Sequence, residues 1–190
     1  MLQPMRLKTH LLALASALLL TTAAHAAPTG QADDLDKLLA DKGLLTQMGQ
    51  VRQNVSNRAS ELVVNAMGFL GVPYKRGGNT VETGFDCSGF VRAMYEQSIG
   101  LVLPRRAEQQ AAATQNIDRT DLQPGDLVFF NTMRRAFSHV GIYVGEGKFI
   151  HSPKPGAEVR VESMNMSYWQ RRFDGARRVQ STQAANASGE

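Results

Sequence analysis

One short stretch, Gly84-Phe85-Asp86-Cys87-Ser88-Gly89-Phe90-Val91, most constrains this chain, because it holds the only cysteine of the 190 residues. Asp86 is a favourable helix N-cap, and Gly100 is a natural residue for ending a helix. Between them, apolar side chains keep the helical period together with Cys87, at Phe90, Val91, Met94 and Tyr95. The pattern predicts a helix that begins at Cys87 and turns the thiol toward the protein interior.

A cysteine in the first turn of a helix has two interpretations. Unpaired backbone N–H groups and the positive end of the helix dipole favour the thiolate, so Cys87 could be a nucleophile with a pKa below the free-thiol value of about 8.5. A buried structural cysteine is the commoner fate of a free thiol. This stretch alone does not separate the two.

The first 26 residues resemble a secretory leader. Arg6 and Lys8 precede an apolar run over residues 11–20, and Ala24-His25-Ala26 is a small-x-small cleavage site. The run is shorter than the roughly 20 residues that a membrane span needs, and no later stretch approaches that length. We therefore expect a signal peptide cleaved after Ala26, export to the periplasm or medium, and no transmembrane segment. Because no cysteine lies near the cleavage site, a lipid anchor is not expected.

Export changes the weighing of Cys87. Exported proteins usually pair their cysteines in disulfides, and a single cysteine cannot form an intramolecular bridge. A lone thiol that persists in such a compartment is better explained by chemistry. Of the four histidines, His10 and His25 leave with the leader, so His139 and His151 are the candidates for a base.

Composition limits the partners. A chain with 43% hydrophobic and 20% charged residues is ordinary for one globular domain. The formal net charge of +4 falls to +2 once Arg6 and Lys8 leave with the leader, so nucleic acid is not implied. A cluster of arginines near the C-terminus is typical of a solvated face, although a cell-wall polyanion is also compatible with it: Arg171, Arg172, Arg177 and Arg178.

The remaining pattern predicts an α+β domain with its helices first. Residues 27–56 read as a polar linker or short helix, residues 57–179 as the domain, and residues 180–190 as a disordered tail. Helices are expected over 57–70, from Cys87 to Gly100 and over 105–115, and a glycine-containing loop over 75–84 would bring backbone close to a ligand. Strands are expected over 127–130, 139–144, 148–152, 157–163 and 175–179.

The predicted hairpin brings the two histidines together. A three-residue turn over 145–147 would pair Val144 with Lys148 and therefore Gly141 with His151, with His139 as the diagonal neighbour. At that spacing one imidazole can reach the other. If the Cys87 helix packs on the same face, the result is a nucleophile, a base and a group that orients the base. The alternative is two core histidines at strand ends.

Several segments in the same order resemble the NlpC-type cysteine peptidases, bacterial cell-wall hydrolases, and look closest to the Spr-type murein DD-endopeptidases. The resemblance runs from about Ser60 to Val179, and the segments that carry it are Gly71-Val72-Pro73-Tyr74, Gly77-Gly78, Phe85-Asp86-Cys87-Ser88-Gly89-Phe90, Leu103-Pro104-Arg105, Pro124-Gly125-Asp126-Leu127, His139-Val140-Gly141-Ile142-Tyr143, His151-Ser152, Met164-Asn165 and Tyr168-Trp169.

The resemblance implies a papain-like fold, with helices that carry the cysteine packed on an antiparallel sheet that carries the histidines. It implies Cys87 as nucleophile, His139 as general base and His151 as the third polar residue. It also places Tyr74 near the oxyanion, and Asp86 and Ser88 at the substrate site.

The implied substrate is the stem or cross-link peptide of peptidoglycan, cleaved by a monomer that requires neither a metal nor an organic cofactor. The DD cross-link between meso-diaminopimelate and D-alanine is favoured over the bond from γ-D-glutamate to diaminopimelate.

Two features depart from the family pattern. The Spr-type relatives are typically lipoproteins, and this chain has no lipobox cysteine. Arg106 stands where the family usually has Ser or Thr, which removes the helix cap expected there and adds a cation that could meet a stem-peptide carboxylate.

Two alternatives from other classes remain. Cys87, His139 and His151 could be three ligands of a zinc hydrolase, although no short ligand spacing accompanies them. The domain could also be an inactive wall-binding module, but such a module has little reason to keep all three polar residues.

Overall fold

A computed structural model describes residue 37 and residues 43–180 of the chain. The chain divides into two units, residues 1–45 and 46–190, and the sheet with its covering helices belongs to the second. The predicted signal peptide, most of residues 27–42 and the predicted tail from residue 181 lie outside the described residues.

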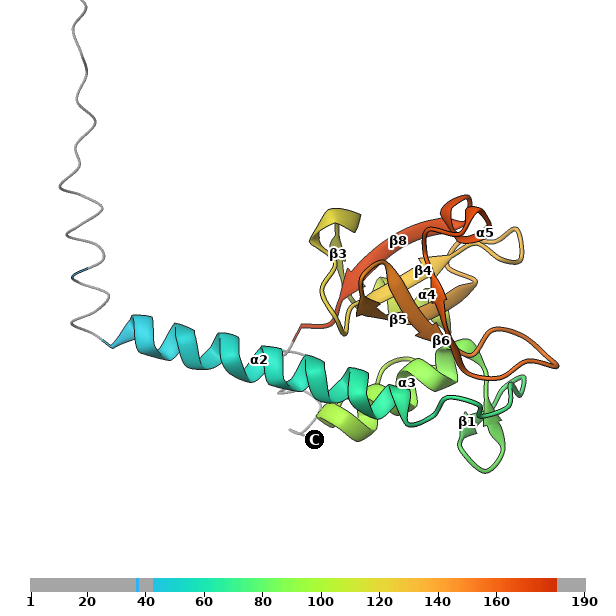
Figure 1. Ribbon diagram of the computed structural model, residues 1–190, viewed down its shortest axis with the longest axis horizontal. Coiled ribbons are helices and arrows are strands. Elements are labelled where there is room, and N and C mark those ends of the chain that lie inside the picture. Colours follow the sequence, from blue (N-terminus) through green and yellow to red (C-terminus); the bar gives the residue numbers. More distant parts are fainter. Residues whose placement is uncertain (1–36, 38–42, 181–190) are drawn as a thin grey trace, which may run out of the picture. The chain divides into compact units, whose positions relative to one another are not determined.

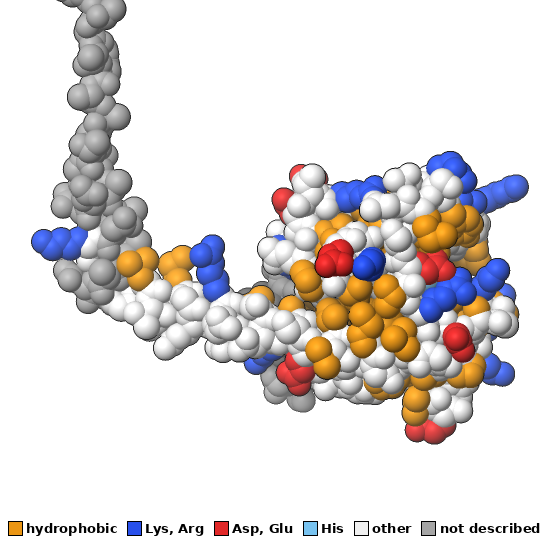
Figure 2. Space-filling model, viewed as in Figure 1, with side chains coloured by type: hydrophobic (Ala, Val, Ile, Leu, Met, Phe, Trp, Pro, Cys, Tyr) orange, Lys and Arg blue, Asp and Glu red, His pale blue; other side chains and the backbone are white. Residues whose placement is uncertain are grey.

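Helix α2 spans Leu44–Met67, so residues 44–56 are helical rather than a linker, and the helix expected to begin near residue 57 begins at Leu44 instead. This segment has no proline, and its one glycine, Gly49, does not interrupt the helix. Only its C-terminal half is anchored, by the buried Leu62 and Ala66. Hydrophobic side chains of the other half, such as Val51 and Val55, are exposed (Figure 2).

Helix α3 spans Cys87–Ile99 and matches the sequence pattern. The Asp86 side chain accepts the backbone N–H of Gly89, which is the predicted N-cap, and Gly100 ends the helix in the left-handed conformation at φ 71°. The predicted apolar face is buried at Phe90, Val91, Met94 and Tyr95.

Six strands form one antiparallel sheet in the order β3-β8-β4-β5-β6-β7 (Figure 1). Their bounds are Gln115–Ile117 for β3, Leu127–Phe130 for β4, His139–Gly145 for β5, Lys148–His151 for β6, Arg160–Ser163 for β7 and Phe173–Arg178 for β8. The smaller elements are β1 (Asn79–Thr80) with β2 (Gly84–Phe85), α4 (Ala107–Ala112), a 3-10 turn (Arg119–Asp121) and α5 (Ser167–Gln170).

The α+β class and most strands agree with the sequence, and the differences fall on short elements. The predicted helix over 105–115 shortens to α4, because residues from Gln115 join the edge of the sheet as β3. The strand expected over 157–163 is regular only from Arg160, while Glu158 makes one isolated bridge to Pro73. The 3-10 turn and α5 were not expected from the sequence.

The β5–β6 hairpin reaches the expected register by a different turn. Gly145 pairs with Lys148 across Glu146 and Gly147, which both have positive φ as a type I′ turn requires. The predicted pairing of Val144 with Lys148 is therefore wrong. The register shifts by one residue between Tyr143 and Gly145, so Ile142 still pairs with Ile150. The bulge restores the register that sets Gly141 opposite His151.

Two hydrophobic clusters cover the two faces of the sheet. The first joins α2 and α3 to one face, with Leu62, Phe85, Phe90, Met94, Phe129, Val140, Ile142 and Ile150. The second lies on the other face beneath α5, with Val128, Phe130, Phe149, Met164 and Trp169. Because side chains alternate along a strand, neighbouring residues of β4, β5 and β6 belong to different clusters.

None of the helices within the described residues has both the length and the apolar character that crossing a bilayer requires.

The anchoring of α2 makes a stability prediction. Leu62 is 2% exposed in the first cluster, so Leu62→Ala should lower the free energy of unfolding by about 2–5 kcal/mol. Val51 lies on the same helix but is 61% exposed, so Val51→Ala should change it by less than about 0.5 kcal/mol. Urea unfolding of the two variants measures both values. Equal losses would contradict the anchoring described for α2.

Candidate active site

Cys87 is the first residue of α3 and is partly buried against the first cluster. Its sulfur interacts with the backbone N–H groups of Val140, Ser88 and Cys87 itself, all of which favour the thiolate. Val140 follows His139 on β5, so the thiol lies at the beginning of that strand. A nucleophile in this position has backbone donors on two sides.

The pKa of the Cys87 thiol is nevertheless raised, to about 11, which corrects the expectation of a lowered pKa. Burial is the largest cause, because it disfavours the charged form, and the carboxylate of Asp86 adds repulsion. The three backbone donors act in the opposite direction but do not outweigh burial. The resting thiol is therefore protonated at neutral pH.

Asp86 ties the start of α3 to two other segments. Besides capping the helix, it forms a two-pronged ion pair with Arg105, from Nη1 to Oδ1 at 3.0 Å and from Nη2 to Oδ2 at 2.6 Å. Its Oδ2 also accepts the N–H of Gly77 at 2.9 Å. Arg105 was seen in the sequence only as part of the family resemblance, and here it positions Asp86, the residue that precedes Cys87.

Ser88 is 6% exposed, and its hydroxyl lies 3.4 Å from Asp86 Oδ1 and 3.1 Å from Arg105 Nη1. Its carbonyl accepts from the buried side chain of Gln110 at 3.0 Å. Asp86 and Ser88 thus have partners inside the protein, which support the helix start. Their predicted contact with substrate stays a prediction.

Tyr74 is half-buried beside this network. Its backbone bridges to Phe85, and the pKa of its phenol is raised by burial first and then by the nearby charges of Cys87 and Asp86. The repulsion means that the phenol and the thiol share one environment. The phenol is therefore protonated at neutral pH and able to donate a hydrogen bond.

The glycine loop before β2 serves close backbone packing. A Cβ on Gly89 would lie 2.1 Å from the carbonyl oxygen of Gly78, a distance that no side chain tolerates. The first turn of α3 therefore packs directly on the backbone of the loop. The sequence suggested that the backbone of this loop comes close to a ligand. In the structure it comes close to the first turn of α3 instead.

Arg106 is the N-cap residue of α4, immediately before Ala107. Its side chain has no hydrogen-bond acceptor and makes no cap, as the sequence predicts. The Gln109 side chain instead accepts the backbone N–H of Arg106 at 3.3 Å. The guanidinium forms an ion pair with Glu108 at 2.5 Å and is largely exposed. The added cation thus already has a carboxylate partner within the chain.

The two histidines form a direct hydrogen-bonded pair. His139 Nε2 lies 2.7 Å from His151 Nδ1, and both side chains are buried. Gly141 allows β6 to pack closely beside it, because a Cβ there would lie 2.6 Å from Cδ2 of Phe149 and 3.2 Å from the Cβ of His151. Burial, followed by the neighbouring His151, lowers the pKa of His139 well below its usual value of 6.5. The pair is therefore neutral at neutral pH.

Beyond His151 lies a carboxylate that the sequence did not reveal. Glu162 of β7 has its Oε2 3.6 Å from His151 Nε2, and the same oxygen accepts the indole N–H of Trp169. Arg160 forms an ion pair with the other oxygen of Glu162. The His139 ring is stacked on Trp169, with ring centroids 5.6 Å apart.

The sequence made the triad conditional on the Cys87 helix packing on the face that carries the imidazoles, and the structure places the thiol and the imidazoles in different hydrophobic clusters. The rings of His139 and His151 pack among Phe130, Phe149 and Trp169 of the second cluster. Cys87 packs on the first cluster and reaches the backbone at the start of β5. His139 is the first residue of β5 and precedes Val140, whose backbone N–H the Cys87 sulfur reaches.

The zinc alternative finds no support in this geometry. His139 and His151 turn nitrogens toward each other rather than toward a common point. Across residue 37 and residues 43–180, no group of three or more His, Cys, Asp or Glu side chains is arranged to hold a metal ion.

The raised pKa of Cys87 makes a prediction for Asp86. Asp86→Asn keeps an oxygen for the N-cap but removes the charge that repels the thiolate, so the pKa of Cys87 should fall. The pH midpoint of alkylation by iodoacetamide should move to lower pH. Asp118→Asn, which removes an exposed carboxylate, should leave the midpoint unchanged. An unchanged midpoint in a folded Asp86→Asn protein would contradict the assigned cause.

Comparisons with known proteins identify the family of the domain. Residues 71–178 match the model of the NlpC/P60 family. The chain is 44% identical over 126 residues to murein DD-endopeptidase MepH of Escherichia coli K12, covering 64% of this chain and 46% of that protein. It is 41% identical over 118 residues to gamma-DL-glutamyl hydrolase of Bacillus subtilis 168, covering 62% of this chain and 28% of that protein.

A solved structure shares the fold. The NlpC/P60 domain of the peptidoglycan hydrolase SagA superposes with a TM-score of 0.57 at 33% identity, covering 64% of this chain and 98% of that domain. The chain spans about half or less of the length of the two curated relatives. Since the family model covers more than half of the chain and the papain-like arrangement of helices and sheet is shared, this chain belongs to the NlpC/P60 family.

Proposed function

We propose that this protein is a cysteine peptidase that hydrolyses peptide bonds in the stem or cross-link peptides of peptidoglycan. The observation that carries the proposal is the meeting of two elements at the start of β5. There the capped helix start with Cys87 contacts the backbone of the residue that follows His139, and His139 is bonded to His151. A thiol, a base and an orienting group are the parts that covalent acyl transfer needs.

The hydrogen bond between the imidazoles supports different roles for the two histidines. His139 Nε2 is engaged by His151 at 2.7 Å, which leaves Nδ1 of His139 for the thiol. His139 is then the general base, and His151 orients it. Protein groups hold the base in place before substrate binds.

Charge separation is coupled to the attack on the substrate. Burial raises the pKa of the Cys87 thiol and lowers the pKa of His139, so a preformed thiolate–imidazolium pair is disfavoured in the resting site. The thiol proton passes to His139 as sulfur attacks the peptide carbonyl. The imidazolium then protonates the leaving amine, and water hydrolyses the thioester with His139 again as base.

The oxyanion is stabilised by donors near the nucleophile. The backbone N–H of Cys87 lies at the positive end of α3, and the Tyr74 phenol shares the environment of the thiol. The backbone of Tyr74 is tied to this region by its bridge to Phe85.

Relatives support the substrate class and leave two bonds open. MepH is named as a murein DD-endopeptidase, and the B. subtilis relative as a gamma-DL-glutamyl hydrolase. We favour the DD cross-link between meso-diaminopimelate and D-alanine, with the bond from γ-D-glutamate to diaminopimelate as the alternative. We place the protein outside the cytoplasm, in the periplasm or medium and without a lipid anchor, and we expect it to act as a monomer.

Digestion of purified sacculi tests the proposal. The protein lacking residues 1–26 should release muropeptides whose masses identify the bond, and Cys87→Ala should release none while keeping its circular dichroism spectrum. Loss of one sulfur from a partly buried site leaves the packing of α3 in place. Full activity in folded Cys87→Ala would sink the cysteine-peptidase mechanism. Binding to sacculi without turnover by the unaltered protein would instead support the wall-binding module.

The two histidines should differ in the substitutions that they tolerate. His139→Ala removes the base and should lower the turnover by about 10²–10⁴-fold. His151→Asn can still accept a hydrogen bond from His139 through its amide oxygen, so it should keep more activity than His151→Ala. Turnover numbers on a purified muropeptide measure the order. If His151→Asn were as inactive as His139→Ala while His139→Asn retained substantial rate, base and orienter would be reversed.

A further inference from the structure

One ring nitrogen of His151 takes no part in the hydrogen bond between the two histidines. The side chain is fully buried, Nδ1 is bonded to His139, and Nε2 has no hydrogen-bond partner within 3.5 Å among the described residues. The carboxylate oxygen Oε2 of Glu162 lies 3.6 Å from that nitrogen. This separation is slightly longer than a hydrogen bond, and in a buried site the attraction between an N–H and a carboxylate extends over it.

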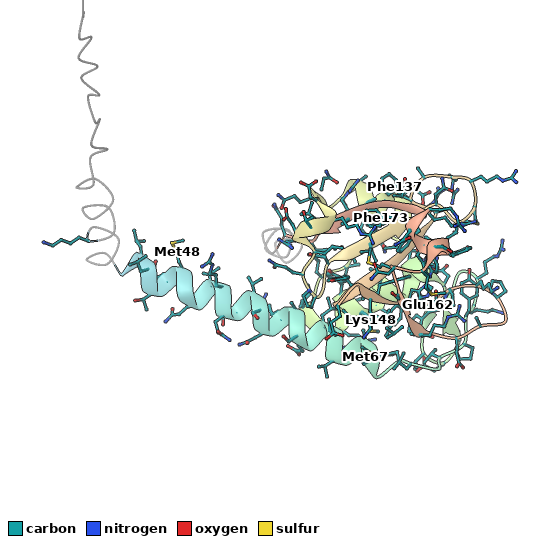
Figure 3. The ribbon with its side chains drawn as sticks, turned by 45° about the horizontal axis from the view of Figure 1, so that its top comes forward. Met48, Met67, Phe137, Lys148, Glu162 and Phe173 are labelled. Carbon is teal, nitrogen blue, oxygen red and sulfur yellow. The ribbon has the colours of Figure 1, made fainter. Side chains whose placement is uncertain are left out.

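The position of Glu162 is well defined by its other contacts. Its side chain is 15% exposed, accepts the indole N–H of Trp169 on the oxygen that faces His151, and forms an ion pair with Arg160 through the other oxygen. Phe149 and Trp169 enclose the His151 ring, and Figure 3 labels Glu162 on β7, the strand next to β6. A carboxylate held in this way stays ionised and accepts hydrogen bonds only.

An acceptor at this place determines where each proton lies. If Glu162 attracts a proton to His151 Nε2, then His151 Nδ1 carries the lone pair in the neutral ring. His139 Nε2 must then be the donor in the bond of 2.7 Å, and His139 Nδ1 carries the lone pair. The opposite tautomers would put a proton on His139 Nδ1 and leave no base for the thiol.

We propose that Glu162 is a positioning residue that fixes the tautomers of His151 and His139, so that Nδ1 of His139, the nitrogen not bonded to His151, is the one able to accept a proton. The role in turnover rests on the proposed function, whereas the tautomers do not. Glu162 acts through His151 and lies behind it, so it has no contact with substrate in this arrangement.

A merely structural role for Glu162 makes a different prediction. As an acceptor for Trp169 and a partner for Arg160, it contributes packing and hydrogen bonds that a glutamine of equal size largely keeps. A neutral amide, however, can present either an oxygen or an NH₂ group to His151 and no longer biases its tautomer. Glu162→Gln therefore separates charge from shape, and Glu162→Asp keeps the charge on a shorter side chain.

The first measurement is the tautomer state, which needs no substrate. Without residues 1–26 the chain keeps only His139 and His151, so ¹⁵N-histidine labelling gives spectra of two rings. In the unaltered protein both rings should carry the proton on Nε2 and leave Nδ1 bare. Glu162→Gln should show a mixture of tautomers, and Glu162→Asp should restore Nε2–H. A proton on Nδ1 of His151 in the unaltered protein, or unchanged tautomers in Glu162→Gln, would overturn the proposal.

The second measurement is turnover on a muropeptide. Glu162→Gln should lower kcat by about 10–100-fold, as loss of a carboxylate behind a functional histidine does in other sites, with KM unchanged. Glu162→Asp should recover part of the loss. The control is Glu146→Gln on the β5–β6 turn, which removes a carboxylate whose side chain is 84% exposed and should leave kcat unchanged. A wild-type kcat in Glu162→Gln would reject the positioning role.

The two measurements test the proposed function and the role of Glu162 separately. If the unaltered protein released no muropeptides, the proposed function would fail, and the ¹⁵N spectra would still decide whether Glu162 sets the tautomers. If turnover depended on Cys87 while the spectra contradicted the expected tautomers, only the role of Glu162 would fail.

Discussion

The rest of the site depends on the hydrogen bonds and the ion pair that the carboxylate of Asp86 makes. It caps α3, accepts the N–H of Gly77 and pairs with Arg105, so the loop before β2, the start of α3 and the segment before α4 meet immediately before Cys87. A charged side chain that accepts five hydrogen bonds from four residues has little conformational freedom, and the helix start inherits that rigidity. The same charge raises the pKa of the adjacent thiol, so precise placement of Cys87 comes with a less acidic sulfur.

Burial favours the neutral form of the groups on both sides of the site. It raises the pKa of the Cys87 thiol and lowers the pKa of His139 and His151, and each effect keeps a group neutral at rest. Reactivity then depends on geometry: backbone donors at the sulfur, a base with one nitrogen already occupied, and a phenol nearby. In the proposed mechanism, such an arrangement separates charge only when a substrate carbonyl is present to receive the electrons from sulfur.

The sequence predicted the elements that depend on local patterns. The cap at Asp86, the end of α3 at Gly100 and its buried face follow from neighbours in the chain, and the α+β class follows from the order of periodic segments. The start of α2 was misplaced because polar residues permit either a linker or a helix. Glu162 was missed because nothing in its own segment shows that β7 lies beside His151. Arg105 and Trp169 act across the fold in the same way.

The raised pKa of Cys87 also bears on how a single thiol survives oxidation. Peroxides and disulfides are attacked by the thiolate, and a group with a pKa of about 11 has very little thiolate at neutral pH. A strongly acidic cysteine on an open surface would be converted to sulfenic acid or trapped in a mixed disulfide between catalytic cycles. This chain has no second cysteine that could resolve such an adduct, and the raised pKa of Cys87 disfavours the thiolate from which the adduct would form.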